Sequence, residues 1–354
     1  MEKTDRKKTR EVSVGKVKIG GDNPVAVQSM TNMDTKDVEA TVKQIKALEA
    51  AGCEIIRVAV PDLESSQVLG KIKERINIPL VADIHFSGKI AIESIKQGVD
   101  KLRINPGNFP KQDLKQIIEL AQERGIPIRV GVNAGSLEKE VLEKHGGATA
   151  EAMVESALRS IQSMQDHGFD NLVLAIKASD IRRTIRAYEL LSEKTDHPLH
   201  LGITEAGTKF SGTIKSSIGI GYLLIKGIGE TLRISLSTDP VEEVRVAWEM
   251  LKALELREKG VQIISCPTCA RASINVTELA PQVEEIFQDI KKPLKIAVMG
   301  CVVNGPGEAG EVDLGVIGAG KKAMIMRKGR ENRFIDKNNL LEELKKEVDS
   351  ILKD

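Results

Sequence analysis

The chain has 354 residues, a formal net charge of +1, 41% hydrophobic residues and 29% charged residues. This size and composition fit a globular protein of two domains. The balanced charge and the aromatic content of 3% argue against a nucleic-acid-binding protein, which needs a basic face or stacking platforms. The charged start MEKTDRKKTREV has no apolar signal segment and no run of 18 apolar residues occurs, so we expect a cytoplasmic protein.

Short Val/Ile/Leu-rich runs alternate with amphipathic helical patterns eight times in the first part of the chain. Helical segments such as KDVEATVKQIKALEAAG and DLKQIIELAQERG end at glycine, which is typical of helix C-termini. The alternation predicts a parallel α/β fold, and eight units over roughly 250 residues match a (β/α)8 TIM-type barrel. The runs start near Val25, Glu54, Pro79, Lys101, Pro127, Asn171, Pro198 and Thr231.

Seven of these runs carry a charged residue on the face of the buried side chains. A charge inside a β-strand costs several kcal/mol unless it is paired or lines a wet cavity, so we expect a ligand site at the barrel rim. Five charges are cationic and two acidic, which favours an anion such as phosphate or diphosphate over a set of structural ion pairs. The seven are Arg57, Asp83, Arg103, Arg129, Lys177, Glu205 and Arg233.

Uncharged polar residues and one histidine extend this face toward the C-terminal ends of the strands, where barrel enzymes place their active sites. They are His85, Asn105, Asn133 and Ser235. His85 could donate a hydrogen bond to a ligand or transfer a proton. The other four histidines fall in segments that we interpret as helix or loop.

The pattern changes after VEEVRVAWEMLKALELREKG, so we expect a domain boundary near Lys259, with domains at 1–259 and 260–354. The second domain should be a smaller α/β unit. Its expected elements are a strand VQIIS, a helix ELAPQVEEIFQDI, a strand LKIAVMG, a turn VNGPGEAGE, two strands in DLGVIGAGKKAMIMRKG and a closing helix NNLLEELKKEVDSILKD.

Three of the four cysteines lie in the second domain, as Cys266-Pro-Thr-Cys269 and Cys301, each at an expected strand end. Three thiolates there favour an iron–sulfur cluster, with structural zinc or a redox dithiol as alternatives. Cys53 precedes a barrel strand and is expected to be a small core residue. Glu308 is therefore the better fourth ligand, and its carboxylate is displaced more easily than a thiolate.

Seven motifs, in order along nearly the whole chain, resemble the 4-hydroxy-3-methylbut-2-enyl diphosphate synthase family of the methylerythritol phosphate route to isoprenoid precursors. They are QSMTNMDT, ADIHFS, KLRINPGN, VGVNAGSLE, GITEAGT, SCPTCAR and MGCVVNGPGE. The resemblance implies a barrel joined to a [4Fe-4S] domain, with Cys266, Cys269, Cys301 and Glu308 as cluster ligands. It implies reductive ring opening and dehydration of 2-C-methyl-D-erythritol 2,4-cyclodiphosphate, with electrons from ferredoxin or flavodoxin.

The resemblance also implies which residues bind the diphosphate and how chains assemble. The expected binding positions are Arg57, Arg103, Arg129, Asn133, Lys177, Arg233 and Ser235, with Asp83, His85, Asn105 and Glu205 nearby. We expect Glu205 to donate the proton, with His85 as its rival. The family forms head-to-tail homodimers in which the cluster domain of one subunit caps the barrel of the other.

Two other functions fit parts of the sequence. A barrel aldolase or phosphate-binding lyase would use Lys177 as a Schiff base beside a structural zinc domain. A non-enzymatic electron carrier would keep the cluster but would leave the charged barrel face unexplained.

Overall fold

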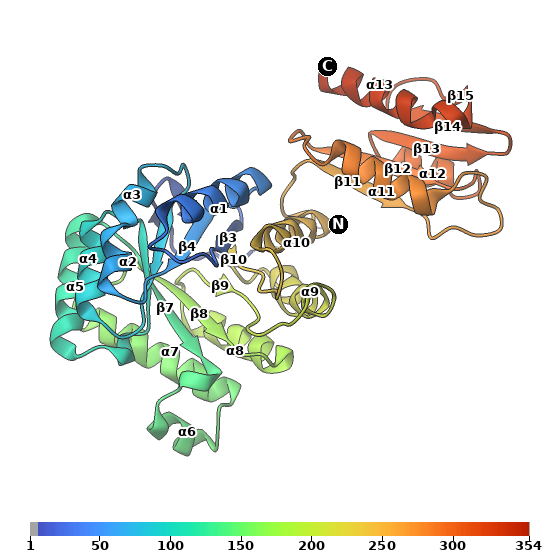
Figure 1. Cartoon of the computed structure of the whole chain (residues 1–354). Coiled ribbons are helices and arrows are strands. Elements are labelled where there is room, and N and C mark those ends of the chain that lie inside the picture. Colours follow the sequence, from blue (N-terminus) through green and yellow to red (C-terminus); the bar gives the residue numbers. More distant parts are fainter. Residues whose placement is uncertain (1–5, 354) are drawn as a thin grey trace. The chain divides into compact units, whose positions relative to one another are not determined.

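The computed structural model describes residues 6–353 and divides into two units between Arg257 and Glu258 (Figure 1). Residues 1–5 of the charged start, where we expect no signal segment, lie outside the described range. Among the described helices, none has the length and apolar character needed to cross a membrane.

The first unit is an eight-stranded parallel barrel, which confirms the predicted TIM-type fold (Figure 1). Its strand order is β8-β7-β6-β5-β4-β3-β10-β9, and a parallel bridge from Leu174 to Leu199 links β8 to the chain before β9. The strands are β3 (Ala26–Met30), β4 (Ile55–Ala59), β5 (Leu80–Asp83), β6 (Lys101–Ile104), β7 (Ile128–Asn133), β8 (Leu172–Lys177), β9 (His200–Leu201) and β10 (Thr231–Leu232). Each lies where an apolar run predicted one.

Helices follow the strands and begin and end at the expected residue types. Asp37 accepts a hydrogen bond from the backbone N–H of Ala40 at the start of the first long helix, and Gly52 ends it in the left-handed conformation. The helices of this unit are α1 (Val38–Ala51), α2 (Leu63–Gln67), α3 (Leu69–Lys73), α4 (Gly88–Lys96), α5 (Lys111–Arg124), α6 (Lys139–His145), α7 (Ala150–Gln165), α8 (Ile181–Lys194), α9 (Lys209–Ile225) and α10 (Pro240–Ala253).

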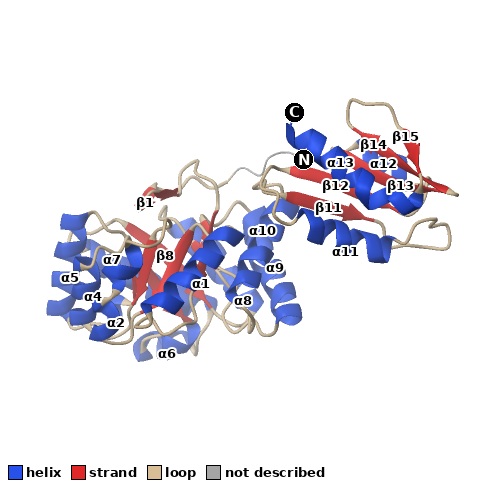
Figure 2. Cartoon of the chain, turned by 45° about the horizontal axis from the view of Figure 1, so that its top comes forward, coloured by secondary structure: helices blue, strands red, loops and turns tan. Residues whose placement is uncertain are grey.

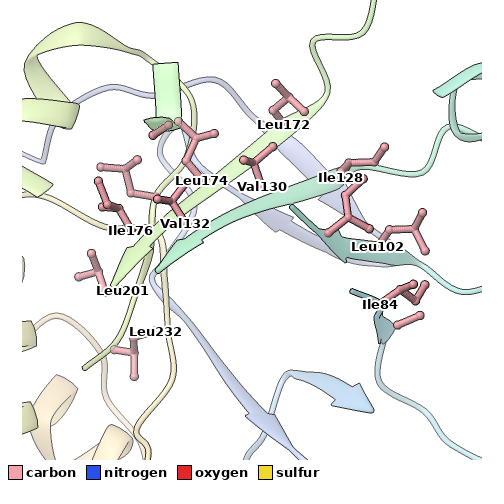
Figure 3. Close-up of a cluster of buried hydrophobic side chains, with 14 of the residues drawn as sticks. Ile84, Leu102, Ile128, Val130, Val132, Leu172, Leu174, Ile176, Leu201 and Leu232 are labelled. Carbon is pink, nitrogen blue, oxygen red and sulfur yellow. The ribbon is translucent and has the colours of Figure 1, made fainter. Parts of the chain in front are cut away.

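Alternation along each strand decides which side chains face the helices. Ile128, Val130 and Val132 of β7 lie in the main apolar cluster between strands and helices (Figure 3). Because side chains alternate across a strand, the intervening Arg129 and Asn133 point into the barrel. Each fully buried aliphatic side chain on the outer face contributes about 1.5–3 kcal/mol, which fixes the strand register and therefore the inward position of the charges.

A short hairpin fills the N-terminal end of the barrel. It consists of β1 (Val12–Val14) and β2 (Val17–Ile19), joined through Gly15 at φ +53°. Its apolar side chains pack against the inward-facing Ala26, Ile55, Val81 and Val173. The sequence analysis did not predict this hairpin, although VSVGKVKI alternates with period two around a glycine. The apolar packing at this end leaves the polar interior at the opposite end.

The second unit is a five-stranded sheet of order β11-β12-β13-β14-β15, parallel from β11 to β13 and antiparallel beyond (Figure 2). Helices α11 and α13 share an apolar cluster with one face, and α12 packs on the other. The elements are β11 (Val261–Ser265), α11 (Val276–Phe287), β12 (Leu294–Met299), α12 (Gly305–Gly310), β13 (Leu314–Ala319), β14 (Lys322–Arg327), β15 (Arg333–Ile335) and α13 (Leu340–Lys353).

Two features of this unit differ from the sequence prediction. The segment expected as a turn contains helix α12, because Pro306 occupies the first helical turn, where a missing N–H is tolerated. Gly305 is required by close packing, since a Cβ there would lie 2.5 Å from Ile317 Cγ2. The short strand β15 was not predicted either, and it is largely exposed.

Candidate active site

Buried cations gather inside the barrel. Arg57, Arg103 and Arg129 are 7%, 6% and 2% exposed, and all three point inward from neighbouring parts of the sheet. Lys177 at the end of β8 is also buried, and Arg233, directly after β10, is half-buried. Together with a further lysine on β6, these residues are called the barrel cations. The set is Arg57, Lys101, Arg103, Arg129, Lys177 and Arg233.

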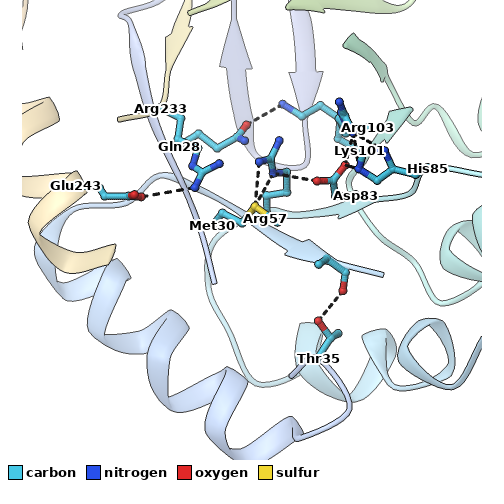
Figure 4. Close-up of polar contacts among 11 residues, drawn as sticks. Gln28, Met30, Thr35, Arg57, Asp83, His85, Lys101, Arg103, Arg233 and Glu243 are labelled. Atoms are coloured by element: carbon cyan, nitrogen blue, oxygen red, sulfur yellow. Dashed lines mark hydrogen bonds and ion pairs between the residues drawn. The ribbon is translucent and has the colours of Figure 1, made fainter. Parts of the chain in front are cut away.

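Two carboxylates neutralise part of this charge (Figure 4). Arg103 Nη1 lies 3.0 Å from Asp83 Oδ1, and Arg57 Nε lies 3.6 Å from Asp83 Oδ2. Burial by itself would raise the pKa of Asp83, but Arg57 and Arg103 outweigh it and lower the pKa below its usual value. Glu243 of α10 accepts a hydrogen bond from the backbone N–H of Leu236, and its other oxygen is 3.9 Å from Arg233. The barrel cations outnumber these carboxylates.

Several buried donors of the barrel cations have no hydrogen-bond partner among the described residues. They are Nε and Nη1 of Arg129, Nε of Arg103 and Nε of Arg233. Arg57 donates from Nε and Nη2 to the thioether of Met30 at 3.1 and 2.9 Å, and a thioether is a weak acceptor. An unsatisfied buried donor costs about 1–3 kcal/mol, so the site is arranged for an anionic acceptor with several oxygens.

Two inward-facing glycines make room for the long cationic side chains. A Cβ on Gly131 would lie 2.8 Å from Arg103 Nε, and a Cβ on Gly202 would lie 2.6 Å from Lys177 Nζ. Any larger residue at either position would move the charged group away.

The electrostatic cost of this arrangement appears in the pKa values. Burial lowers the pKa of Arg57 to about 10, with Asp83 opposing and Arg233 and Arg103 adding to the shift. Burial, followed by neighbouring arginines, lowers the pKa of Lys177 well below its usual value. Both pKa shifts disfavour the charged forms of Arg57 and Lys177. A bound anion would offset the repulsion that the neighbouring cations exert on them.

The other predicted site residues lie at the C-terminal rim. His85 is about half-exposed, with Nε2 at 2.8 Å from Arg103 Nη1, and partial burial followed by Arg103 lowers its pKa. Asn105 accepts a hydrogen bond from the backbone N–H of Gly107, and Asn133 and Ser235 are half-buried. Glu205 is exposed in the loop after β9 with φ +47°, a backbone conformation that few non-glycine residues adopt.

The sequence analysis missed a buried polar layer and two residues that hold arginines. Gln28, Lys101 and His200 lie inside the barrel at 2%, 0% and 0% exposure. His200 belongs to β9, so the prediction that it lies in a helix or loop is wrong. Lys101 could have been predicted to point inward, because it lies two residues before Arg103 on the same strand. The contacts of Glu243 with Arg233 and of Met30 with Arg57 arise only in the tertiary fold.

Parallel strands bring the cysteines of the second unit to one sheet edge. Ser265 pairs with Val298, so Cys266 and Cys301 both follow the C-terminal ends of adjacent strands. The backbone N–H of Gly300 donates to Cys266 Sγ at 3.2 Å. The loop that carries Cys269 folds back to this edge, because the N–H of Ser273 donates to the carbonyl of Gly300. The thiols of Cys266, Cys269 and Cys301 form no disulfide. We call these three cysteines together with Glu308 the cysteine edge.

Two successive helical turns connect Cys301 to Glu308. The N–H of Gly305 donates to the carbonyl of Cys301, and the N–H of Glu308 donates to the carbonyl of Asn304. Residues seven positions apart in such a coil lie on one face. Glu308 is exposed, so its carboxylate is accessible at the cysteine edge.

The cysteine edge fits a cluster by its donor chemistry and close packing. Three thiols, a carboxylate and an N–H aimed at sulfur are the groups that iron–sulfur clusters use. Gly300 has no room for a Cβ, which would lie 2.9 Å from Ala272 Cβ, so the backbone can approach the sulfur of Cys266. As the side chains stand, no group of three histidines, cysteines or carboxylates within residues 6–353 is assembled to hold a metal ion.

Cys53 belongs to the core of the barrel unit, as predicted. It is 3% exposed, and its thiol donates to the carbonyl of Ile55 at 3.1 Å. Burial raises the pKa of this thiol to about 12, which makes it unsuitable as a ligand or nucleophile.

Sequence comparisons match both units to one family. The GcpE TIM-barrel domain matches residues 9–248, and the GcpE protein C-terminal domain matches residues 262–350. Three proteins named 4-hydroxy-3-methylbut-2-en-1-yl diphosphate synthase (flavodoxin) are similar. That of Caldanaerobacter subterraneus subsp. tengcongensis is 58% identical over 99% of both chains. Those of Ruminiclostridium cellulolyticum and Geobacillus thermodenitrificans are 51% and 53% identical, over 97% and 98% of this chain and 98% and 93% of theirs.

Among solved structures, the barrel is similar to dihydropteroate synthases. The Yersinia pestis enzyme aligns with a TM-score of 0.51 at 14% identity, over 69% of this chain and 97% of that one. The Xanthomonas albilineans enzyme gives 0.50 at 13% identity, over 69% and 99%. At such low identity the likeness shows the barrel fold alone.

Proposed function

The chain belongs to the GcpE family, and we propose that it is a flavodoxin-dependent 4-hydroxy-3-methylbut-2-en-1-yl diphosphate synthase whose barrel cations bind the cyclic diphosphate substrate. It is an oxidoreductase of isoprenoid precursor synthesis. The substrate, 2-C-methyl-D-erythritol 2,4-cyclodiphosphate, gains two electrons and one proton, its ring opens, and water leaves. The product is (E)-4-hydroxy-3-methylbut-2-enyl diphosphate.

The observation that supports this binding site is the set of unpaired donors on the barrel cations. Phosphate oxygens accept two parallel hydrogen bonds from a guanidinium group, and Arg129 has two free donors in the barrel interior. Asp83 keeps Arg57 and Arg103 in place through its two oxygens. The remaining proposed contacts come from Asn105, Asn133, Lys177, Arg233 and Ser235.

We assign the cysteine edge to a [4Fe-4S] cluster held by Cys266, Cys269, Cys301 and Glu308. A bound cluster would supply electrons one at a time, and Glu308 would provide a carboxylate ligand, which is displaced more easily than a thiolate. The N–H of Gly300 donates to the sulfur of Cys266, and hydrogen bonds to the sulfurs are one of the means by which proteins tune such clusters. Flavodoxin is the proposed donor of electrons, with ferredoxin as the other candidate, and the reduced thiols suit a cytoplasmic location.

Glu205 is the proposed proton donor for the departing hydroxyl group. Its backbone adopts a positive φ in the loop after β9, at the C-terminal ends of the strands. His85 is the rival. Partial burial, followed by Arg103, lowers its pKa, and its Nε2 lies 2.8 Å from Arg103 Nη1.

A homodimer in which each cysteine edge caps the barrel of the partner is part of the proposal. Helix α9 offers a surface for self-association, because it exposes a stripe of large apolar side chains along one face. They are Phe210, Ile214, Ile218, Tyr222 and Ile225, at 80%, 45%, 55%, 38% and 56% exposure. Stripes of this kind on soluble proteins mark interaction sites.

The two rival functions do not account for these observations. A zinc-supported lyase would use Lys177 as a Schiff base, and the lowered pKa of Lys177 is compatible with that role, but this function does not account for the family match of both units. An electron carrier would leave the barrel cations without a role. Borohydride treatment with substrate should therefore leave Lys177 unlabelled.

Anaerobic turnover tests the proposal. Protein purified without oxygen should be brown, bind close to four irons per chain, and convert the cyclic diphosphate with reduced flavodoxin. Cys301→Ser should lose colour and turnover, and Glu308→Ala should weaken one of them. Cys53→Ala is the matched control and should keep both. A colourless chain with one zinc, or turnover that survives Cys301→Ser, would contradict the assignment.

A further inference from the structure

A fully buried lysine lies inside the barrel one inward position before Arg103 (Figure 4). Lys101 is 0% exposed, and its ammonium contacts the amide oxygen of Gln28 at 3.4 Å. It precedes Arg103 by two residues on β6 and is therefore nearer the N-terminal end of the barrel. It is one of the barrel cations, but no contact with the substrate is assigned to it above.

The groups around Lys101 are mostly cationic. The positive charges of Arg129 on β7 and Arg57 on β4 repel the ammonium group of Lys101 and so disfavour its charged form. His200 of β9 also faces this region, with Nδ1 at 2.8 Å from Thr231 Oγ1 and a buried Nε2 that has no partner among the described residues. The other barrel charges are Arg103, Lys177, Arg233, Asp83 and Glu243.

In the protein without ligand, this environment makes the charged form of Lys101 energetically unfavourable. Its acceptor is one neutral amide oxygen, whereas Asp83 is held by two arginines and Glu243 lies near Arg233. Burial, followed by Arg129 and Arg57, lowers the pKa of Lys101 to about 7. Near neutral pH the amine and the ammonium are therefore both available before a ligand binds.

We infer that Lys101 takes up a proton when the barrel cations bind a diphosphate, which makes Lys101 a positioning residue that couples substrate binding to proton uptake. A polyanion beside the arginines offsets the repulsion that disfavours the ammonium. The inference rests on the proposed function. It also suits the chemistry, because opening a cyclic diphosphate to a linear one creates a terminal phosphate and adds negative charge to the bound anion.

Calorimetry with the cluster-loaded protein and no reductant tests the inference. The cyclic diphosphate is the probe, since each phosphorus carries one ester and one anhydride bond and keeps only a strongly acidic hydroxyl group, which does not titrate near neutral pH. Heats measured at pH 8 in two buffers of different ionisation enthalpy give the protons bound. We expect uptake of up to one proton at pH 8, falling toward zero at pH 6, and a Kd that rises up to about fivefold from pH 7 to pH 8.

Variants identify the group that binds the proton. Lys101→Met should abolish the uptake and flatten the dependence of Kd on pH. Lys101→Arg keeps a permanent charge and should bind without uptake, which preserves the test if the methionine variant does not fold. Lys96→Met removes an exposed lysine of α4 and should behave as the unmodified protein.

Three results have distinct meanings. Binding without proton uptake at pH 8 in the unmodified protein would overturn the inference. Uptake that persists in both Lys101 variants would also overturn it, because another group such as His85 would then hold the proton. Failure of the cyclic diphosphate to bind would instead overturn the proposed function.

Discussion

Arg129 shows how one residue can be costly to the fold and useful to the site. It is 2% exposed, and burial followed by Arg57 and Arg103 lowers its pKa well below the usual value. Two of its donors have no partner among the described residues. A side chain with this environment weakens the empty protein and gains hydrogen bonds when an anion binds, as expected of a binding residue.

Arg129→Met should therefore weaken substrate binding strongly without harming the fold. Loss of charge-assisted hydrogen bonds worth about 1.5–3 kcal/mol predicts a KM for the cyclic diphosphate about 10- to 100-fold higher. Iron content and unfolding temperature should not fall. Steady-state kinetics beside Arg124→Met, an exposed arginine of α5, check this result. An unchanged KM would show that Arg129 does not bind the substrate.

Glu230 should make stability depend on pH, away from the site. It is 1% exposed, and burial raises its pKa to about 7 despite a hydrogen bond from the N–H of Leu199. A carboxyl group with a raised pKa favours folding while protonated. Its contribution to the free energy of unfolding is full below about pH 4.5 and declines by up to about 3 kcal/mol as the pH rises to about 7.

Glu230→Gln should remove this decline. At pH 8 the variant should melt at a higher temperature than the unmodified protein, and near pH 5 the difference should shrink. Thermal unfolding at both pH values, beside the exposed Glu74→Gln, measures it. A difference in melting temperature that is the same at both pH values would show that the carboxyl group is already ionised at low pH.

The barrel strands determine where the barrel cations lie, and inward-facing glycines leave room for their long side chains. The outward residues of β7 and β8 hold the register through the apolar cluster. Gly202 of the loop after β9 then leaves room for Lys177. The same backbone that builds the barrel therefore sets the spacing of the proposed anion site.

Gly202→Ala should displace Lys177 and impair binding. Its Cβ would lie 2.6 Å from Lys177 Nζ and 3.1 Å from the carbonyl of Arg233. The lysine must move, so KM should rise several-fold. Gly221→Ala on α9 is the control, because its Cβ meets nothing within 4 Å and alanine favours helices. Equal KM values for the two variants would contradict the tight fit.

Much of the fold could be read from the sequence, because period-two runs and glycine-terminated helices are local signals. The inward position of Arg57, Asp83 and Arg129 followed from the same alternation. Features that depend on tertiary contact could not be read. Glu243 approaches Arg233 from a helix, and Gly305 of α12 packs closely on the sheet. The roles of the predicted site residues remain to be tested.

For the whole molecule, the two units have separate cores and separate chemistry. The barrel unit holds buried cations, and the second unit holds three free thiols at one sheet edge. Reduction of a bound substrate needs both in one place. Capping of one chain's barrel by another chain's cysteine edge would provide this, so the assembly state is part of the account.

The apolar stripe of α9 should be required for self-association. The unmodified protein should sediment at about twice the chain mass of 38.6 kDa. Ile218→Glu should reduce this mass toward that of one chain, because burial of a charge in an apolar interface is costly. Leu63→Glu changes an exposed apolar residue on α2 and should not. A single-chain mass for the unmodified protein would contradict dimerisation.

Mixing two impaired variants, at a substrate concentration where each alone has little turnover, tests capping between chains. Arg129→Met damages only the barrel, and Cys301→Ser damages only the cysteine edge. If sites form between chains, a mixed dimer contains one undamaged site and recovers up to half of the activity per dimer. The measurement is turnover after the two proteins are exchanged. No recovery despite demonstrated exchange would place both halves of the site in one chain.

The most direct test is a crystal structure of the protein with the cyclic diphosphate. The account predicts phosphate oxygens within hydrogen-bond distance of Nε and Nη1 of Arg129 and Nε of Arg103, the donors that lack partners in the structure. A substrate bound elsewhere, with these donors still unpaired, would contradict it.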